Sequence, residues 1–122
     1  MTIMGAINHI DAIKPNRYSL TEKIKWLSTL DGVVKEEIID THKGGENIPF
    51  AEYTEELLTQ ELLVPAPYDD IYIKWLEAQI DYANGEYGKY NNTITVYNRA
   101  LADYERHYNR THMPKGQNFK YF

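Results

Sequence analysis

Hydrophobic side chains recur at helical spacing over most of this chain, and most densely between residues 68 and 111. The first part of that stretch has an apolar row at intervals of three and four residues: Tyr72, Leu76, Ile80, Ala83, Tyr87 and Tyr90. A second row lies about 100° around the same helix, so the apolar face is wide. Its members are Ile71, Trp75, Ala78 and Tyr82. This pattern predicts an amphipathic helix with a broad buried side.

A second amphipathic helix follows in the same stretch. Its apolar row contains Ile94, Tyr97, Leu101, Tyr104 and Tyr108. The polar sequence Tyr90-Asn91-Asn92-Thr93 separates the two rows, and we expect it to be the link between the helices. A short polar link usually folds two helices back on each other. Residues 68–111 are therefore predicted to form a long antiparallel helical hairpin.

Two more helices are expected before the hairpin. Residues 2–13 place isoleucines on one face, and Lys14-Pro15 ends that helix because the residue before proline is biased away from helical geometry. Ser19-Leu20-Thr21-Glu22 is a capping box, in which the serine oxygen accepts from the Glu22 amide. The apolar period after it stays in phase across Gly32. We expect one helix from there to about Asp40, bent, if anywhere, at Asp31-Gly32.

The rest of the chain lacks helical periodicity. Residues 42–67 form an irregular segment, either a functional connection or a loop draped over the hairpin. Within it, Val64-Pro65-Ala66-Pro67 is expected to be extended. Pro114 and Gly116 disfavour helix after the hairpin. The predicted architecture is all-α, a small bundle of about four helices, with a single helical domain at 1–113 and an extended C-terminal tail at 114–122.

Length and composition narrow the class of protein. A chain of 122 residues has room for one hydrophobic core, and 43% hydrophobic content is enough to build one. The absence of cysteine excludes disulfides and thiol chemistry. No apolar run approaches the length of a membrane span, so no membrane partner is expected. The formal net charge of −5 argues against generic binding to nucleic acid.

Tyrosine is the unusual residue, with eleven copies against three phenylalanines. A tyrosine places a large ring against a core while its hydroxyl still needs a partner or water. One interpretation is a small core with wet edges. The other is contact between subunits, because tyrosine is enriched at protein interfaces. Composition does not separate the two.

Patterns that carry chemistry are missing from the sequence. There is no glycine-rich phosphate loop and no activated serine, since Ser19 is a cap and Ser28 lies within a helix. The four histidines have no metal-ligand spacing and are expected at the surface or half-buried. They are His9, His42, His107 and His112. We expect no enzymatic activity, no catalytic residue, no cofactor and no metal site.

Charge is distributed unevenly along the chain. No acidic residue follows Glu105, while four basic residues do, so the remainder carries −9 (−5 less +4). Aromatic residues are interleaved with these cations near the end of the chain. Such a segment suits an acidic protein surface, a DNA backbone or simple solvation. The candidate partner-binding residues are Arg106, Arg110, Met113, Lys115, Phe119, Lys120, Tyr121 and Phe122.

Several strings resemble small proteins encoded in tailed phages and prophages of Gram-positive bacteria. They are Trp26-Leu27-Ser28-Thr29-Leu30-Asp31-Gly32, the run from Leu62 to Tyr72, Ile80-Asp81-Tyr82-Ala83-Asn84-Gly85-Glu86, Tyr90-Asn91-Asn92 and the run from Tyr108 to Pro114. The similarity covers about residues 10 to 115. These small proteins resemble the head–tail connector, or adaptor, proteins of long-tailed phages.

The resemblance implies a structural role in the virion. Adaptors form a ring, usually twelve-fold, beneath the portal protein, extend the DNA channel and offer a surface to the next neck, head-completion or tail protein. The implied partners are therefore the portal, that next protein, other copies of this chain, and DNA that passes without sequence-specific binding. The implied location is the neck of the virion, and the host cytoplasm during assembly. The alternative function is a small phage accessory or regulatory protein that binds another protein in the cytoplasm.

Overall fold

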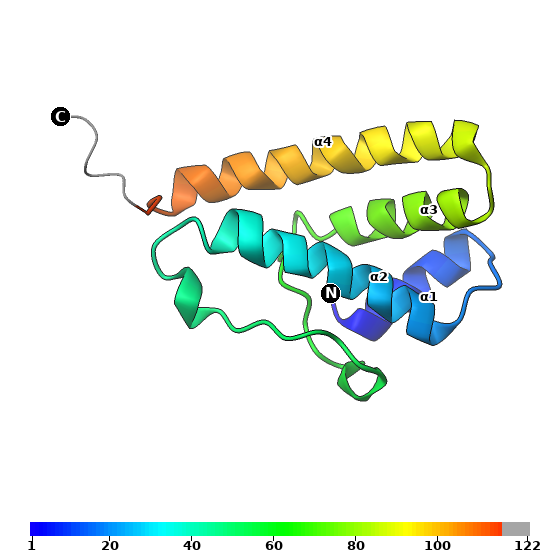
Figure 1. Ribbon diagram of the computed structural model, residues 1–122, viewed down its shortest axis with the longest axis horizontal. Helices are drawn as coiled ribbons and strands as arrows, with labels where there is room; N and C mark the ends of the chain where they lie inside the picture. Colours follow the sequence, from blue (N-terminus) through cyan, green and yellow to red (C-terminus); the bar gives the residue numbers. More distant parts are fainter. Residues whose placement is uncertain (116–122) are drawn as a thin grey trace.

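Four α-helices form the framework of the protein. The computed structural model describes residues 1–115, and its helices are α1 (Ile3–Ile13), α2 (Leu20–Val34), α3 (Ile71–Ala83) and α4 (Tyr87–Thr111). Figure 1 shows α4 lying along α3, with α2 beneath this pair and α1 packed at one end of α2. No strand occurs within residues 1–115, so the predicted small all-α bundle is confirmed.

Helix α1 begins at Thr2, as the sequence predicts, but part of its cap comes from far along the chain. The Thr2 hydroxyl accepts from the Gly5 amide at 2.9 Å. The first two amides of the helix, those of Ile3 and Met4, donate to the carbonyls of Gln60 and Leu58 at 3.0 Å each. The first amides of a helix have no partner within the helix. The irregular segment therefore closes the start of α1.

Helix α2 begins at the predicted cap, where the Ser19 hydroxyl accepts from the Glu22 amide at 3.1 Å. It passes Gly32 and continues to Val34, and a π-helical turn, η1 (Lys35–Ile39), extends it to Asp40. The expected length is correct. The irregularity lies in η1, and not at Asp31-Gly32. The Lys35 ammonium bonds the Asp40 carboxylate at 2.5 Å and the Gly45 carbonyl at 2.6 Å, which ties this widened turn to the segment after it.

The predicted hairpin is present, but its link was placed too late. The turn lies at Asn84-Gly85-Glu86, while Tyr90-Asn91-Asn92-Thr93 lies inside the first turns of α4. Gly85 has φ +76°, the left-handed conformation that commonly ends a helix. The Thr93 hydroxyl bonds the Asp81 carboxylate at 3.1 Å, so a polar side chain in this part of α4 has a partner on α3. Tyr87 and Tyr90 therefore belong to α4, not to the first helix.

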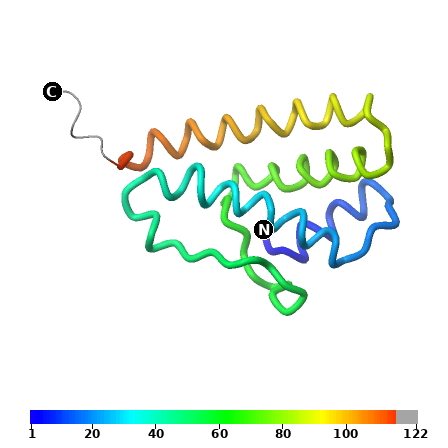
Figure 2. Tube along the Cα trace, viewed as in Figure 1, coloured from blue at the N-terminus to red at the C-terminus, as the bar shows by residue number. Residues whose placement is uncertain are grey.

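Residues 42–67 are irregular, as expected, with two short 3-10 turns, η2 (Gly45–Asn47) and η3 (Glu55–Leu57). Most of the segment runs beneath α2, on the side away from α4, so it does not lie along the hairpin, and only its first residues contact the end of α4 (Figure 2). Residues 64–67 are not helical, but they are not an extended run either. The Tyr68 amide donates to the Pro65 carbonyl at 2.9 Å, closing a turn that contains a cis Ala66–Pro67 peptide bond.

Candidate interaction surfaces

A buried carboxylate fixes the irregular segment against the helices. Asp31 is fully buried and accepts from the hydroxyls of Tyr53 at 2.5 Å and Tyr72 at 2.6 Å, and from the Leu63 amide at 3.0 Å. The Tyr72 hydroxyl in turn accepts from the Val64 amide at 2.7 Å. This network joins α2 and α3 to two separate parts of the irregular segment. It holds residues 53, 63 and 64 of that segment against the helices.

Burial controls the protonation of this network. Desolvation raises the pKa of Asp31, although the three hydrogen bonds it accepts favour the anion and oppose that rise. Desolvation and the nearby Asp31 charge raise the pKa values of Tyr53 and Tyr72, so both hydroxyls keep their protons and remain donors. Each tyrosine therefore acts as a fixed donor to one carboxylate. The sequence places Asp31 within an apolar stripe but does not identify its partners.

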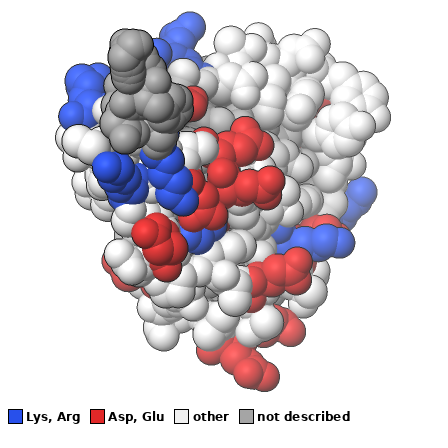
Figure 3. Space-filling model, turned by 60° about the vertical axis from the view of Figure 1, so that its left-hand side comes forward, with Lys and Arg blue, Asp and Glu red and all other residues white. Residues whose placement is uncertain are grey.

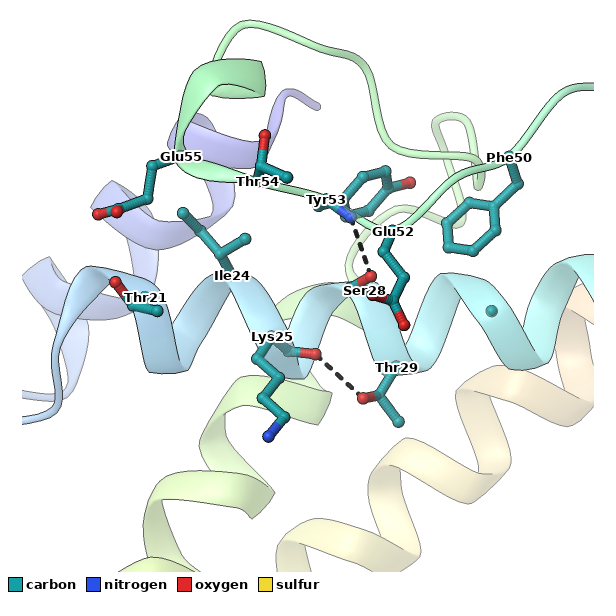
Figure 4. Close-up of a pocket in the computed structure, with 11 residues that line it drawn as sticks. Thr21, Ile24, Lys25, Ser28, Thr29, Phe50, Glu52, Tyr53, Thr54 and Glu55 are labelled. Atoms are coloured by element: carbon teal, nitrogen blue, oxygen red, sulfur yellow. Dashed lines mark hydrogen bonds between the residues drawn. The ribbon is translucent and has the colours of Figure 1, made fainter.

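A groove lies between α2 and residues 50–55. Its volume is about 560 Å³, and it is open to solvent along one side. Figure 4 shows Ile24 and the ring of Tyr53 between the two walls, Phe50 at one end and Glu52 hanging over the rim. The Tyr53 amide donates to the Ser28 hydroxyl at 3.1 Å, which holds the loop wall to the helix. The groove has an apolar interior and charged groups at its rim.

The candidate partner-binding residues that lie within residues 1–115 gather at one end of the bundle. Arg106 and Arg110 are exposed on the last turns of α4, and Met113 and Lys115 are exposed just beyond it. Arg106 is paired with Asp103. Figure 3, turned so that this end comes forward, shows Lys and Arg side chains gathered toward its upper left and Asp and Glu across its middle. Phe119, Lys120, Tyr121 and Phe122 lie outside the described residues.

The chain after α4 is fastened to the end of the second helix. The Lys43 amide donates to the Met113 carbonyl at 2.8 Å, and the Lys115 amide donates to the Thr41 carbonyl at 3.0 Å. These bonds flank an antiparallel bridge between His42 and Pro114. The predicted extended tail of 114–122 therefore begins with two residues that are paired to the body of the protein.

His42 corrects one expectation, because it is buried rather than at the surface. Its Nδ1 lies 2.6 Å from the Ile38 carbonyl oxygen, and its Nε2 lies 2.8 Å from Oδ1 of Asn109. Its ring also packs edge-on against Tyr108, which stacks on His112 at 3.7 Å between ring centroids. A lone histidine after a helix carries no sequence signal for this packing. Its effect is to hold the end of α4, and so the basic residues, in place.

The opposite end of the hairpin presents aromatic rings. Tyr82 and Tyr87 are 56% and 58% exposed, and the Tyr82 ring contacts those of Tyr87 and Tyr90 at 5.5 and 5.1 Å. We call Tyr82, Tyr87 and Tyr90 the aromatic tip. Next to Tyr82 in the chain, the buried Asp81 pairs with Lys14 at 2.7 Å, which joins this end of α3 to the end of α1. Five other tyrosines are buried in the core, as the first interpretation of the tyrosines expects: Tyr53, Tyr72, Tyr97, Tyr104 and Tyr108. Contact between subunits stays a prediction.

Other kinds of site find no support among residues 1–115. No three acidic or histidine side chains in this range come together as metal ligands, and no helix in it is long and apolar enough to cross a membrane. A scan against protein-family models and searches of curated proteins and of solved structures found no match.

Proposed function

We propose that this chain is a structural subunit of a phage head–tail connector, which assembles as a ring beneath the portal, extends the DNA channel and joins head to tail. The observation that carries this proposal is the contrast between the two ends of the α3–α4 hairpin. The aromatic tip lies at one end, and the basic end, with Arg106, Arg110 and Lys115, lies at the other (Figure 1). The similarity of several sequence strings to small phage proteins supports the same role.

Two different ends suit a subunit that has unlike neighbours. In a ring, one surface of each subunit meets a different surface of the next, so a self-complementary face is not enough. Exposed tyrosines supply contact area with a polar edge, as protein interfaces commonly use. The basic end suits an acidic surface on the portal or on the next neck protein.

The charge of the body suits contact with a moving duplex. Apart from the basic residues after Glu105, the chain carries −9 (−5 less +4). A channel wall rich in cations would grip the phosphate backbone, whereas an acidic wall lets DNA slide. The proposal therefore assigns the cations to contacts with protein and the acidic body to the channel.

Co-purification with the portal protein tests the proposal. A variant with Arg106→Glu and Arg110→Glu should lose the portal, because both side chains are exposed and the substitutions reverse the charge of the proposed contact. The matched control is Arg17→Glu with Lys25→Glu, which makes the same change in net charge at exposed positions away from this end. The control should keep the portal. Equal retention by both variants, or no retention by the unaltered protein, would contradict the proposal.

Removal of residues 116–122 tests the predicted role of the tail. The cut falls after Lys115, because Pro114 and Lys115 are paired with residues 41–42 and their removal would disturb the fold. We expect the helical circular dichroism signal to stay unchanged and the joining of tails to filled heads to be lost. Infectious particles assembled from the shortened protein would refute the role of the tail. Steep salt-dependent DNA binding that requires Arg106 and Arg110 would instead favour a DNA-binding function.

A further inference from the structure

A small hollow lies on the hairpin, between α3 and α4. It is open to solvent, and its volume is about 200 Å³, enough for one large side chain. Its walls are formed by Lys74 and Glu77 of α3 and by Asn92, Thr93 and Val96 of α4. We infer that this hollow receives the side chain of Tyr87 from a second copy of the chain. The contact rests on the proposed ring, for which it names the two surfaces that meet.

Both surfaces carry apolar side chains that a single copy leaves uncovered. Within residues 1–115, five large hydrophobic side chains are exposed, and three of them belong to these two surfaces. Val96, at the hollow, is 44% exposed, and Tyr82 and Tyr87 belong to the aromatic tip. Apolar groups gathered on a surface mark sites of interaction. Contact between the tip of one copy and the hollow of another removes both surfaces from water.

The polar groups of the hollow suit a tyrosine. The ion pair between Lys74 and Glu77 is long, at 3.9 Å, so both groups remain able to bond another partner. An ammonium group is attracted to the face of an aromatic ring. A tyrosine hydroxyl donates readily to a carboxylate, as two buried tyrosines of this protein do to Asp31. One charge of each sign favours such a neutral, hydroxyl-bearing ring over a strongly acidic or basic partner.

Tyr87 is the tip residue best placed to enter the hollow of another copy. It is the first residue of α4, and among the aromatic contacts within the tip it makes one, whereas Tyr82 makes two. Lys89 beside it is paired with Glu86 at 2.9 Å, so the tip brings no unpaired cation from this position. Val96 of the same chain lies nine residues further on, about 14 Å along the helix at 1.5 Å per residue. The hollow that Tyr87 enters therefore belongs to a second copy.

The contact joins two different surfaces of the chain. Each copy that inserts its tip keeps its own hollow for a further copy, so the contact can repeat from subunit to subunit. A head-to-tail contact of this kind gives a ring when the rotation between subunits closes. A self-complementary contact would instead stop at two copies.

Disulfide trapping tests the contact in the full chain. The protein has no cysteine, so Gly88→Cys, next to Tyr87, and Val96→Cys, at the hollow, each give a chain with a single thiol. A Cβ at position 88 meets no atom within 4 Å. The two variants carry tags of different mass and are mixed at high concentration in glutathione buffer. Random pairing gives no more mixed than unmixed dimers. We expect a several-fold excess of mixed dimers, and no excess would overturn the inference.

Two further samples test the inserted residue and the direction of the contact. Tyr87→Ala in the Gly88→Cys chain should abolish the excess and Tyr87→Phe, which keeps the ring, should retain most of it; an excess that persists in Tyr87→Ala would overturn the role of Tyr87. A chain with both Gly88→Cys and Val96→Cys should give a ladder of cross-linked oligomers. Its two thiols are about 12 Å apart along the helix, too far for a disulfide within one chain. Cross-linking that stops at dimers would refute the head-to-tail contact.

Portal binding is measured separately, so the two proposals can fail independently. A chain that co-purifies with the portal but gives no excess of mixed dimers would refute this contact alone. An excess of mixed dimers in a chain that does not bind the portal would support the contact and contradict the connector role.

Discussion

Removing the hydroxyl of Tyr72 should destabilise the protein more than removing that of Tyr53, although both donate to the same buried carboxylate. Tyr53→Phe removes one hydrogen bond to Asp31, and a hydrogen bond to a charged group contributes about 1.5–3 kcal/mol. Tyr72→Phe removes the equivalent bond, and it also leaves the buried Val64 amide without its acceptor. An unsatisfied buried amide costs about 1–3 kcal/mol more.

Urea unfolding, followed by circular dichroism, measures this difference. We expect the free energy of unfolding to fall by about 1.5–3 kcal/mol in Tyr53→Phe and by about 2.5–6 kcal/mol in Tyr72→Phe. Tyr87→Phe is the control, because Tyr87 is 58% exposed, and it should change the value by less than about 0.5 kcal/mol. An equal or larger effect of Tyr53→Phe would refute the assignment of the Val64 amide to Tyr72.

Three further predictions follow from burial, backbone conformation and charge. Leu76→Ala should lower the free energy of unfolding by about 2–5 kcal/mol, because Leu76 is fully buried. Leu101→Ala should lower it by less, because Leu101 is half-buried. Equal losses of stability in chemical denaturation would contradict this packing. Gly32→Ala should raise the melting temperature, since alanine is more favourable than glycine in a helix interior by up to about 1 kcal/mol. Gly85→Ala should lower the melting temperature, since the φ angle of residue 85 is +76°. Changes of the same sign would refute the two backbone assignments. Folding raises the pKa of Asp31, so as the pH increases above the ordinary carboxyl pKa the unfolded chain loses this proton first, and the stability of the folded state falls. The free energy of unfolding, measured across that pH range, should fall less in Asp31→Asn. Identical pH profiles of the two proteins would exclude this coupling.

The first half of the fold could be predicted because its signals are local. The Ser19 capping box depends on residues three apart, and Lys14-Pro15 ends α1 through the proline ring itself. The hairpin as a whole was also predictable from its apolar rows. The position of the link between its helices could not be predicted, because the pattern of apolar residues does not distinguish Gly32 from Gly85. One continues a helix and the other adopts a left-handed conformation at its end.

The surfaces were predictable only in part. Arg106, Arg110, Met113 and Lys115 were identified from charge and composition, and the structure places all four, exposed, at one end. The groove was not predictable, since one of its walls is an aperiodic segment. The position of that wall depends on hydrogen bonds from Tyr53 and Tyr72 to Asp31, which lies far from both tyrosines in the sequence. Long-range hydrogen bonds of this kind leave no local pattern.

The way α1 is capped has a consequence for synthesis of the protein on the ribosome. The free amides of Ile3 and Met4 find their acceptors at Gln60 and Leu58, which emerge long after α1 itself. An isolated helix of eleven residues is marginal in water. During synthesis, α1 should therefore stay sensitive to proteases until residues 58–60 have left the exit tunnel, and then become protected in a single step.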